Sequence, residues 1–191
     1  MPATPRRTRS DALHNRERLL EVAAQAFADQ GLDTAPAAIA KQAGVGVGTL
    51  YRHFPTREAL IDAAYRHQLI RVCEKAPDLL ARHPAAEATR MWMEHFVNYA
   101  TAKSGMSAAL NAVIASGVDP YADSRALLTA AVATLLEAGA RDGSLRTDVT
   151  SDDVLLLMGG IAYAVQHGTK EQASRLVGLL MDALANGPSG S

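Results

Sequence analysis

The segment from Ile39 to Leu60, IAKQAGVGVGTLYRHFPTREAL, constrains the local fold more strongly than composition does. It contains two short stretches with helical spacing, joined by a glycine-rich connection and closed by Pro55, which cannot continue a helix. Two short helices around a tight turn form a helix-turn-helix, whose second helix enters the major groove of DNA. A bundle hairpin with a glycine-rich connector has the same spacing, so spacing alone leaves both interpretations open.

The order of side chains in the second stretch favours the first interpretation. Leu50 and Phe54 lie four residues apart and form one apolar side, which we expect to pack on Ile39, Ala40 and Val45. A helix this short contributes little core, yet its other side carries hydrogen-bond donors and small apolar groups. The residues of this second stretch that we expect to contact DNA are Val47, Gly48, Thr49, Tyr51, Arg52 and His53. Arg57, in the first turn of the next helix, is expected to contact a phosphate.

Composition predicts an all-α fold for the whole chain. Alanine supplies 37 and leucine 22 of the 191 residues, whereas aromatic residues reach 5%. Residues 1–75 carry 11 Lys and Arg against 8 Asp and Glu, and the remainder carries 8 against 12, so the basic part contains the candidate DNA segment. The periodicity predicts helices at about 14–30, 36–43, 47–54, 56–75, 85–103, 106–116, 120–141, 151–167 and 170–186.

At residues 43–60, AGVGVGTLYRHFPTREAL, the chain resembles the helix-turn-helix of the TetR family of bacterial transcriptional regulators. The upstream pattern of Leu20, Ala23 and Phe27, followed by Gly31-Leu32 and Ile39-Ala40, fits the same family, so the resemblance covers about residues 14–62. It implies a homodimer that binds double-stranded DNA at a palindromic operator, usually as a repressor, and leaves it when a small-molecule effector binds.

The resemblance also implies roles for single residues. It places Val47 and Thr49 near base edges or adjacent phosphates, and Tyr51, His53 and Arg57 on the DNA backbone. The chain departs from the family pattern at two points. Gly46 stands where the family often has a serine N-cap, and Ala35-Pro36 stands where a Ser or Thr is common, which leaves Thr34 as the nearby substitute for a phosphate contact.

The domain organisation follows from these elements. We expect a flexible basic arm at 1–13, with Arg6, Arg7 and Arg9 able to follow a groove, and a three-helix DNA-binding domain at 14–57 with its helix-turn-helix at about 35–54. A helical effector-binding and dimerisation domain is expected at 58–186, followed by a disordered tail at 187–191. The N-terminus lacks the apolar run of a signal peptide and the longest apolar run spans 12 residues, so we expect a cytoplasmic protein without a membrane segment.

The second domain offers a candidate cavity and a candidate interface. The helix at 85–103 is apolar nearly all round, which fits either a central core helix or a cavity wall. No lysine or arginine falls on the apolar faces, so a largely apolar effector is expected. The candidate ligand residues are Trp92, His95, Phe96, Tyr99, Met106, Leu110, Tyr121, Leu127, Met158 and Tyr163. The candidate dimer residues, on the last two helices, are Leu155, Leu156, Gly159, Ile161, Leu176, Leu179, Leu180 and Ala183.

Other chemistries have weak support in the sequence. The glycines at 44–48 lack the G-x-G-x-x-G spacing and a following lysine, which disfavours a phosphate-binding loop. The histidines show no metal-ligand spacing, and no nucleophile elbow or acid–base pair is evident, so we expect no metal, no cofactor and no catalytic residue. The competing hypothesis is an all-helical small-molecule-binding or enzymatic domain whose N-terminal hairpin does not bind DNA.

Overall fold

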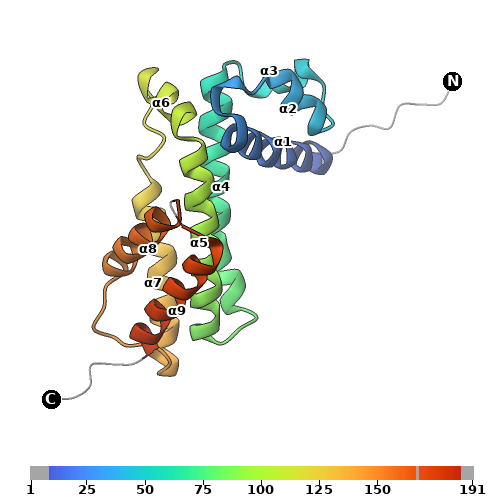
Figure 1. The fold of residues 1–191 in the computed structure, drawn as a ribbon. Helices are drawn as coiled ribbons and strands as arrows, with labels where there is room; N and C mark the ends of the chain where they lie inside the picture. Colours follow the sequence, from blue (N-terminus) through green and yellow to red (C-terminus); the bar gives the residue numbers. More distant parts are fainter. Residues whose placement is uncertain (1–8, 167, 186–191) are drawn as a thin grey trace. The chain divides into compact units, whose positions relative to one another are not determined.

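The computed structural model describes residues 9–166 and 168–185, and within these ranges it contains helices and no strand, as predicted (Figure 1). Arg6, Arg7 and the predicted tail at 187–191 lie outside the described residues. No helix among those described has the length and apolar character needed to cross a membrane. The elements are α1 (Arg9–Gln30), the 3-10 helix η1 (Gly31–Asp33), α2 (Pro36–Gln42), α3 (Val47–His53), α4 (Arg57–Leu80), α5 (Ala85–Gly105), α6 (Ser107–Ala115), α7 (Ser124–Asp142), α8 (Ser151–Gln166) and α9 (Lys170–Ala185).

Three helix boundaries differ from the predictions by four or five residues, one of them the start of α7, which lies at Ser124 and not at about residue 120. α1 begins at Arg9, so residues 9–13, predicted as part of the arm, are helical. α4 runs past Lys75 to Leu80 and contains Pro77. A proline within a helix removes the hydrogen bond to the carbonyl four residues earlier, but buried residues on both sides of Pro77 keep this helix in place. They are Ala76 and Leu79.

The chain forms two compact units. The first contains the residues up to Gln68 together with Gly105–Pro120, and the second contains Leu69–Ser104 and the residues from Tyr121 onward. This division differs from the expected boundary at residue 57/58, because the start of α4 and all of α6 belong to the first unit.

The core of the first unit is built from α1, α2, α3, α4 and α6. α1 contacts α2, α2 contacts α3, and α6 contacts η1. The backbone of Gly105 lies so close to α1 that an added Cβ would come within 2.5 Å of the Ala28 carbonyl oxygen. Large side chains that are fully buried in this unit are Leu19, Leu20, Phe27, Ile39, Leu50, Leu60, Ile61, Tyr65, Met106 and Leu110.

The core of the second unit surrounds Trp92 on α5. The Trp92 indole stacks on Phe96 with 5.6 Å between ring centres, and its Nε1 donates to the Val72 carbonyl at 2.9 Å. α7 contacts α8, and α8 contacts α9. Thus α5 contributes Trp92 to the core of this unit, in agreement with one of the two interpretations that its sequence allowed. Buried side chains around it include Met93, Val132, Leu135, Met158, Val177 and Leu184.

Candidate functional site

The turn between α2 and α3 is held by main-chain hydrogen bonds that need a glycine. Gly44 has a φ of 70°, in the left-handed region that residues with a Cβ rarely adopt. The Gly44 amide donates to the Lys41 carbonyl at 3.1 Å, and the Val45 amide donates to the Ala40 carbonyl at 2.9 Å. Together these bonds form a Schellman motif, which ends α2 and fixes the direction in which the chain enters α3.

α3 is anchored at both ends. The Gly46 carbonyl accepts hydrogen bonds from the amides of Thr49 and Leu50 at 2.9 and 3.1 Å, and the Phe54 amide donates to the Leu50 carbonyl at 2.8 Å. Thr56 caps α4, because its Oγ1 accepts the Ala59 amide at 3.1 Å. The side chains predicted to lie on the inner side of α2 and α3 are all buried: Ile39, Ala40, Val45, Leu50 and Phe54.

The outer face of α3, formed by Val47, Gly48, Tyr51 and Arg52, is exposed. A Cβ at Gly48 would meet no heavy atom within 4 Å, so another molecule has room to approach the backbone there. Tyr51 and Arg52 provide hydrogen-bond donors, and Val47 adds a small apolar group next to them. Donors and small apolar groups on one short exposed helix suit contacts to phosphates and base edges.

A hollow of about 140 Å³ extends this face toward α1. Arg16 is exposed at its edge, with its guanidinium carbon 5.7 Å from the centre of the Phe54 ring, in cation–π contact. Sequence reasoning missed Asn15 and Arg16, because α1 was considered only for its buried stripe. The residues that line the hollow are Asn15, Arg16, Leu19, Val45, Thr49, Arg52 and His53.

Two residues predicted to contact phosphates make hydrogen bonds within the chain. The Thr34 side chain is buried, and its Oγ1 donates to the Ala26 carbonyl at 2.9 Å, so the prediction of a phosphate contact from this hydroxyl is wrong. Arg57 Nη2 donates to the carbonyls of Leu32 and Thr34, the latter at 2.7 Å. The Arg57 guanidinium therefore ties the start of α4 to the segment before α2, and its contact with a phosphate stays a prediction.

The second unit contains a hollow of about 640 Å³. Phe96 and Tyr121 are the predicted ligand residues that line it. Contrary to the expectation of walls without lysine or arginine, the hollow also has four charged residues. Lys103 lies in the last turn of α5, Arg125 in the first turn of α7, and two aspartates in the first turn of α8. The lining residues are Phe96, Lys103, Tyr121, Ser124, Arg125, Leu128, Asp152, Asp153, Leu155, Leu156, Gly159 and Gly160.

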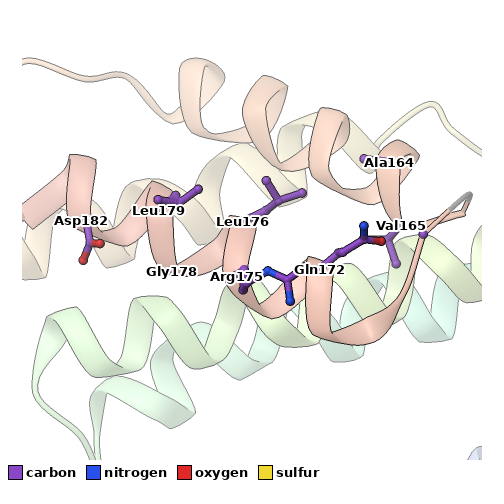
Figure 2. A pocket seen from close by; sticks show the side chains of 9 residues that line it. Ala164, Val165, Gln172, Arg175, Leu176, Gly178, Leu179 and Asp182 are labelled. Atoms are coloured by element: carbon purple, nitrogen blue, oxygen red, sulfur yellow. The ribbon is translucent and has the colours of Figure 1, made fainter.

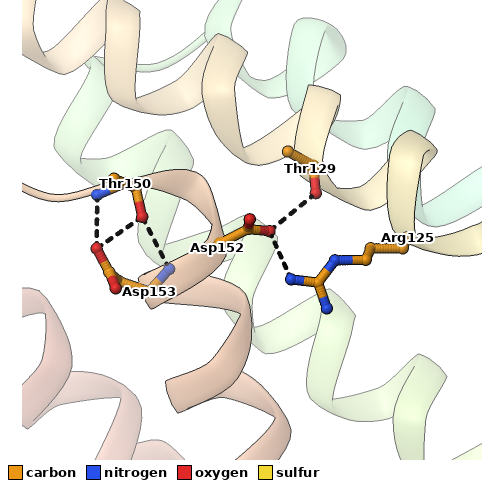
Figure 3. A network of polar contacts seen from close by, with 5 residues as sticks. All are labelled: Arg125, Thr129, Thr150, Asp152 and Asp153. Atoms are coloured by element: carbon orange, nitrogen blue, oxygen red, sulfur yellow. Dashed lines mark hydrogen bonds and ion pairs between the residues drawn. The ribbon is translucent and has the colours of Figure 1, made fainter.

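The charged residues of this hollow are held by specific contacts (Figure 3). Arg125 Nη2 lies 3.0 Å from Asp152 Oδ1, an oxygen that also accepts a long hydrogen bond from Thr129. Asp153 Oδ2 accepts the amide and hydroxyl of Thr150 at 2.9 and 2.6 Å, and these bonds hold the pKa of Asp153 below its usual value. At the edge of the hollow, Arg125 is therefore paired with Asp152, and the Asp153 carboxylate is bound to Thr150.

Lys103 has a different environment in the same hollow. Its Nζ lies 4.4 Å from the centre of the Tyr121 ring, and burial lowers the pKa of its ammonium group. An ammonium group over an aromatic ring is partly removed from water while it keeps an electrostatic attraction. This wall therefore offers a cation and a ring rather than apolar groups alone.

The remaining predicted ligand residues are dispersed. Met106 and Leu110 are buried in the first unit, and Trp92 and Met158 are fully buried core residues of the second. Tyr99 is buried beside Phe96, with 6.0 Å between ring centres, and His95 is partly buried. Leu127 and Tyr163 are exposed. Helical periodicity distinguished apolar positions from polar ones, but it did not separate core from cavity wall.

α8 and α9 expose an apolar face that this unit leaves uncovered. Leu156 is 79% exposed, Tyr163 67% and Leu179 65%, and Leu157 is also exposed. We name this the α8–α9 face. Sequence reasoning missed Leu157 and assigned Tyr163 to the ligand cavity, because the pattern did not indicate which side of α8 turns outward.

The predicted dimer residues fall into three groups by exposure. Leu156, Gly159, Leu179 and Ala183 are exposed, whereas Leu155, Ile161 and Leu176 are partly exposed. Leu180 is buried, because it lies on the inner side of α9, so its placement at an interface is corrected. A groove of about 620 Å³ runs along this face (Figure 2). Its lining residues are Ala164, Val165, Gly168, Gln172, Arg175, Leu176, Gly178, Leu179 and Asp182.

Metal and thiol chemistry find little support in the described part of the chain. It contains no group of three or more His, Cys, Asp or Glu residues arranged to hold a metal ion. Burial, with a smaller contribution from Glu74, raises the pKa of the Cys73 thiol to about 11. At neutral pH such a thiol stays protonated and is a weak nucleophile.

The Schellman turn, the short α3 and its exposed outer face define the first unit as a helix-turn-helix domain. Residues 19–64 match the family model described as bacterial regulatory proteins, tetR family, and residues 84–186 match that of the transcriptional regulator SbtR-like C-terminal domain. The chain belongs to the TetR family of bacterial transcriptional regulators.

Relatives of the chain agree with this assignment. The crystal structure of the TetR transcriptional regulator SCO0520 from Streptomyces coelicolor is 47% identical, covers 92% of this chain and 99% of that chain, and has a TM-score of 0.85. A TetR transcription regulatory protein from Mycobacterium vanbaalenii is 34% identical over 93% of this chain and 99% of its own, with a TM-score of 0.76.

A third relative matches over a shorter stretch. The HTH-type transcriptional regulator SAB2452 from Staphylococcus aureus is 43% identical over 53 residues, which are 27% of this chain and 29% of the staphylococcal protein. The family and these relatives are transcriptional regulators rather than enzymes.

Proposed function

We propose that this protein is a homodimeric transcriptional repressor that binds a palindromic operator and is released from it by a small-molecule effector. The observation that carries the proposal is the outer face of α3, where Val47, Tyr51 and Arg52 are exposed on a helix whose inner side is fully packed. A rigid short helix that presents donors in this way suits the major groove.

DNA contacts are assigned to α3 and to the start of α1. Val47, Gly48, Tyr51 and Arg52 face the base edges and adjacent phosphates, and Thr49 and His53 flank them. Arg16 on α1 adds a cation next to Arg52 across the small hollow. Because phosphate contacts release counterions, affinity for the operator should fall steeply as salt concentration rises.

Dimerisation is assigned to the α8–α9 face. Exposed leucines concentrated on one pair of helices are typical of a surface that a partner covers. A two-fold dimer presents two copies of α3, and two half-sites about 34–36 Å apart would then place both helices in successive major grooves. This symmetry is the reason to expect a palindromic operator.

The effector is assigned to the hollow that Phe96, Lys103 and Tyr121 line. Its rings and leucines suit an apolar body, and Lys103 suits a polar or anionic group at one end, so the effector is amphiphilic rather than wholly apolar. An effector that binds the DNA-free conformation more tightly than the DNA-bound one would weaken operator binding. The loss of operator affinity is set by the ratio of the effector's affinities for the two conformations.

Selection from a random DNA pool with the purified, ligand-free chain tests the proposal. Enrichment of a palindrome, bound with a steep salt dependence, is the expected result. A folded dimer that enriches no sequence at low salt would contradict it. Paired aromatic acids and their neutral amides, added to the complex with the selected DNA, then test whether an anionic end favours release.

A further inference from the structure

One glycine of α9, Gly178, has no packing reason inside the described chain, whereas Gly159 and Gly160 of α8 line the hollow that is assigned to the effector. Gly159 and Gly160 are exposed and Gly178 is partly exposed, and a Cβ at any of them would meet no heavy atom within 4 Å. By contrast, a Cβ at Gly139 of α7 would overlap the Leu145 side chain. Glycine destabilises a helix interior relative to alanine, so Gly178 keeps space free for something outside the subunit.

The outward side of α9 also carries opposite charges on the two sides of Leu179. Arg175 and Asp182 are exposed, Leu179 lies between them, and all three line the groove of Figure 2. Arg175 and Asp182 are seven residues apart, which is about 10 Å along a helix. Each lies three and a half residues from the midpoint between Gly178 and Leu179.

This spacing has a consequence under two-fold symmetry. A two-fold axis perpendicular to a helix produces an antiparallel copy, so each position on one side of the axis meets the equivalent position on the other side. With the axis beside Gly178 and Leu179, the glycine lets the two helices approach closely. The same rotation would bring Arg175 of each helix opposite Asp182 of the other.

We propose that α9 packs antiparallel against α9 of a second copy, centred on Gly178 and Leu179, with Arg175 facing Asp182 of the partner subunit at both ends. The inference rests on the proposed dimerisation and goes further, because it names the register and the residues that select the partner. A parallel or shifted arrangement would bring like charges together or leave the two charges unmatched. Charges placed in this way favour a second copy of the same chain over related chains with another pattern.

Charge reversal tests this register directly. R175D places two carboxylates opposite each other at both ends of the interface, and D182R places two guanidinium groups there. Each single variant should weaken homodimerisation about tenfold or more. The double variant R175D/D182R should return to within about threefold of the wild-type dissociation constant, measured by analytical ultracentrifugation.

Mixing the two single variants gives a second test. In a heterodimer of R175D with D182R both ends carry opposite charges, so the mixture should form heterodimers in preference to either homodimer. Glu137→Arg, a charge reversal on the exposed side of α7, is the matched control and should leave the dissociation constant unchanged. Circular dichroism checks that the variants fold. If the charge reversals do not fold, the neutral variants R175Q and D182N replace them. Each neutral variant should weaken the dimer, and the double variant R175Q/D182N should be no weaker than either single variant.

The outcomes separate this inference from the proposal on which it rests. A wild-type chain that stays monomeric at every concentration would overturn the homodimer and the register together. A wild-type dimer whose single reversals associate as tightly as the wild type would overturn the register alone. A double variant weaker than both single variants would also overturn it.

Discussion

The outer face of α3 and the α8–α9 face both expose apolar side chains, but their surroundings differ. On α3, Val47 and Tyr51 alternate with donors such as Arg52, on a helix of seven residues. On α8, Leu156 and Leu157 follow one another directly and belong to a run of apolar residues. Both faces have glycines whose missing side chains leave open space. Apolar groups mixed with donors suit a polyanion, whereas consecutive leucines suit a protein partner.

The largest expected effect comes from placing charge on the α8–α9 face. Leu156→Glu combined with Leu179→Glu would bury four carboxylates in a two-fold interface, a desolvation that a dimer cannot tolerate. We expect a folded monomer and a loss of operator affinity of about a hundredfold or more, because binding to two half-sites is no longer linked. Analytical ultracentrifugation and fluorescence anisotropy measure the two effects.

The matched control for that variant is Leu127→Glu, on a leucine of α7 that is exposed but outside the α8–α9 face. It should leave both the dimer and operator binding intact. Equal losses from Leu127→Glu would mean that added negative charge, rather than its location, weakens the complex.

Substitutions on the outer face of α3 are expected to act on DNA alone. Tyr51→Ala and Arg52→Ala should each reduce operator affinity about 10- to 100-fold without changing the dimer. Arg52→Ala should also flatten the salt dependence, by about one unit of slope for each phosphate that the arginine no longer neutralises. Arg141→Ala, which removes an exposed cation from the end of α7, should leave the slope unchanged. Unchanged affinity in both α3 variants would contradict the assigned face.

The variant Arg57→Ala distinguishes two roles for this side chain, a contact with DNA and the positioning of the helices. Its guanidinium bonds to the carbonyls of Leu32 and Thr34, so Arg57→Ala should lower the free energy of unfolding by about 1.5–3 kcal/mol. Under conditions where the variant is folded, the salt slope of operator binding should match the wild type. A flattened slope with unchanged stability would instead place Arg57 on a phosphate.

The second unit should respond to pH through His95. Burial, followed by the nearby Lys75 charge, lowers the pKa of His95 in the folded state. The unfolded chain then binds the proton more readily, so stability is lost as pH falls through the unfolded value of about 6.5 and levels off below the folded pKa. His95→Gln should reduce this loss in urea denaturation curves, by less than the effect of Arg57→Ala. An unchanged pH profile would contradict it.

The first unit was predictable from sequence in most respects, because its signals are local. The glycine turn, the inner positions Leu50 and Phe54, and the Thr56 cap each depend on residues a few positions apart. The hydrogen bonds of Thr34 and Arg57 within the chain were not predicted, because their partners, Ala26 and Leu32, lie 8 and 25 residues away. No local pattern indicates such partners.

The second unit was less predictable, because its helices are apolar on several sides. Periodicity identifies an apolar stripe, but the packing of neighbouring helices decides which part of it is core, cavity wall or outer surface. Tyr163 was expected in a cavity and is exposed, whereas Leu180 was expected at an interface and is buried. Lys103 and Arg125 border the hollow from helix ends, where the periodicity of an apolar stripe does not place them.

The smallest expected effect concerns the start of α3 and separates its two neighbouring glycines. Gly46 is the N-cap, with a φ of −71°, and a Cβ there would lie 3.8 Å from Thr49 Oγ1, an ordinary contact. Gly46→Ser should therefore add a capping acceptor and raise the free energy of unfolding by about 0.3 kcal/mol. Gly44→Ser, at a φ of 70°, should lower it by about 1–2 kcal/mol. Differential scanning calorimetry should show opposite shifts in Tm. Shifts of the same sign would mean that backbone conformation does not decide which glycine this helix-turn-helix needs.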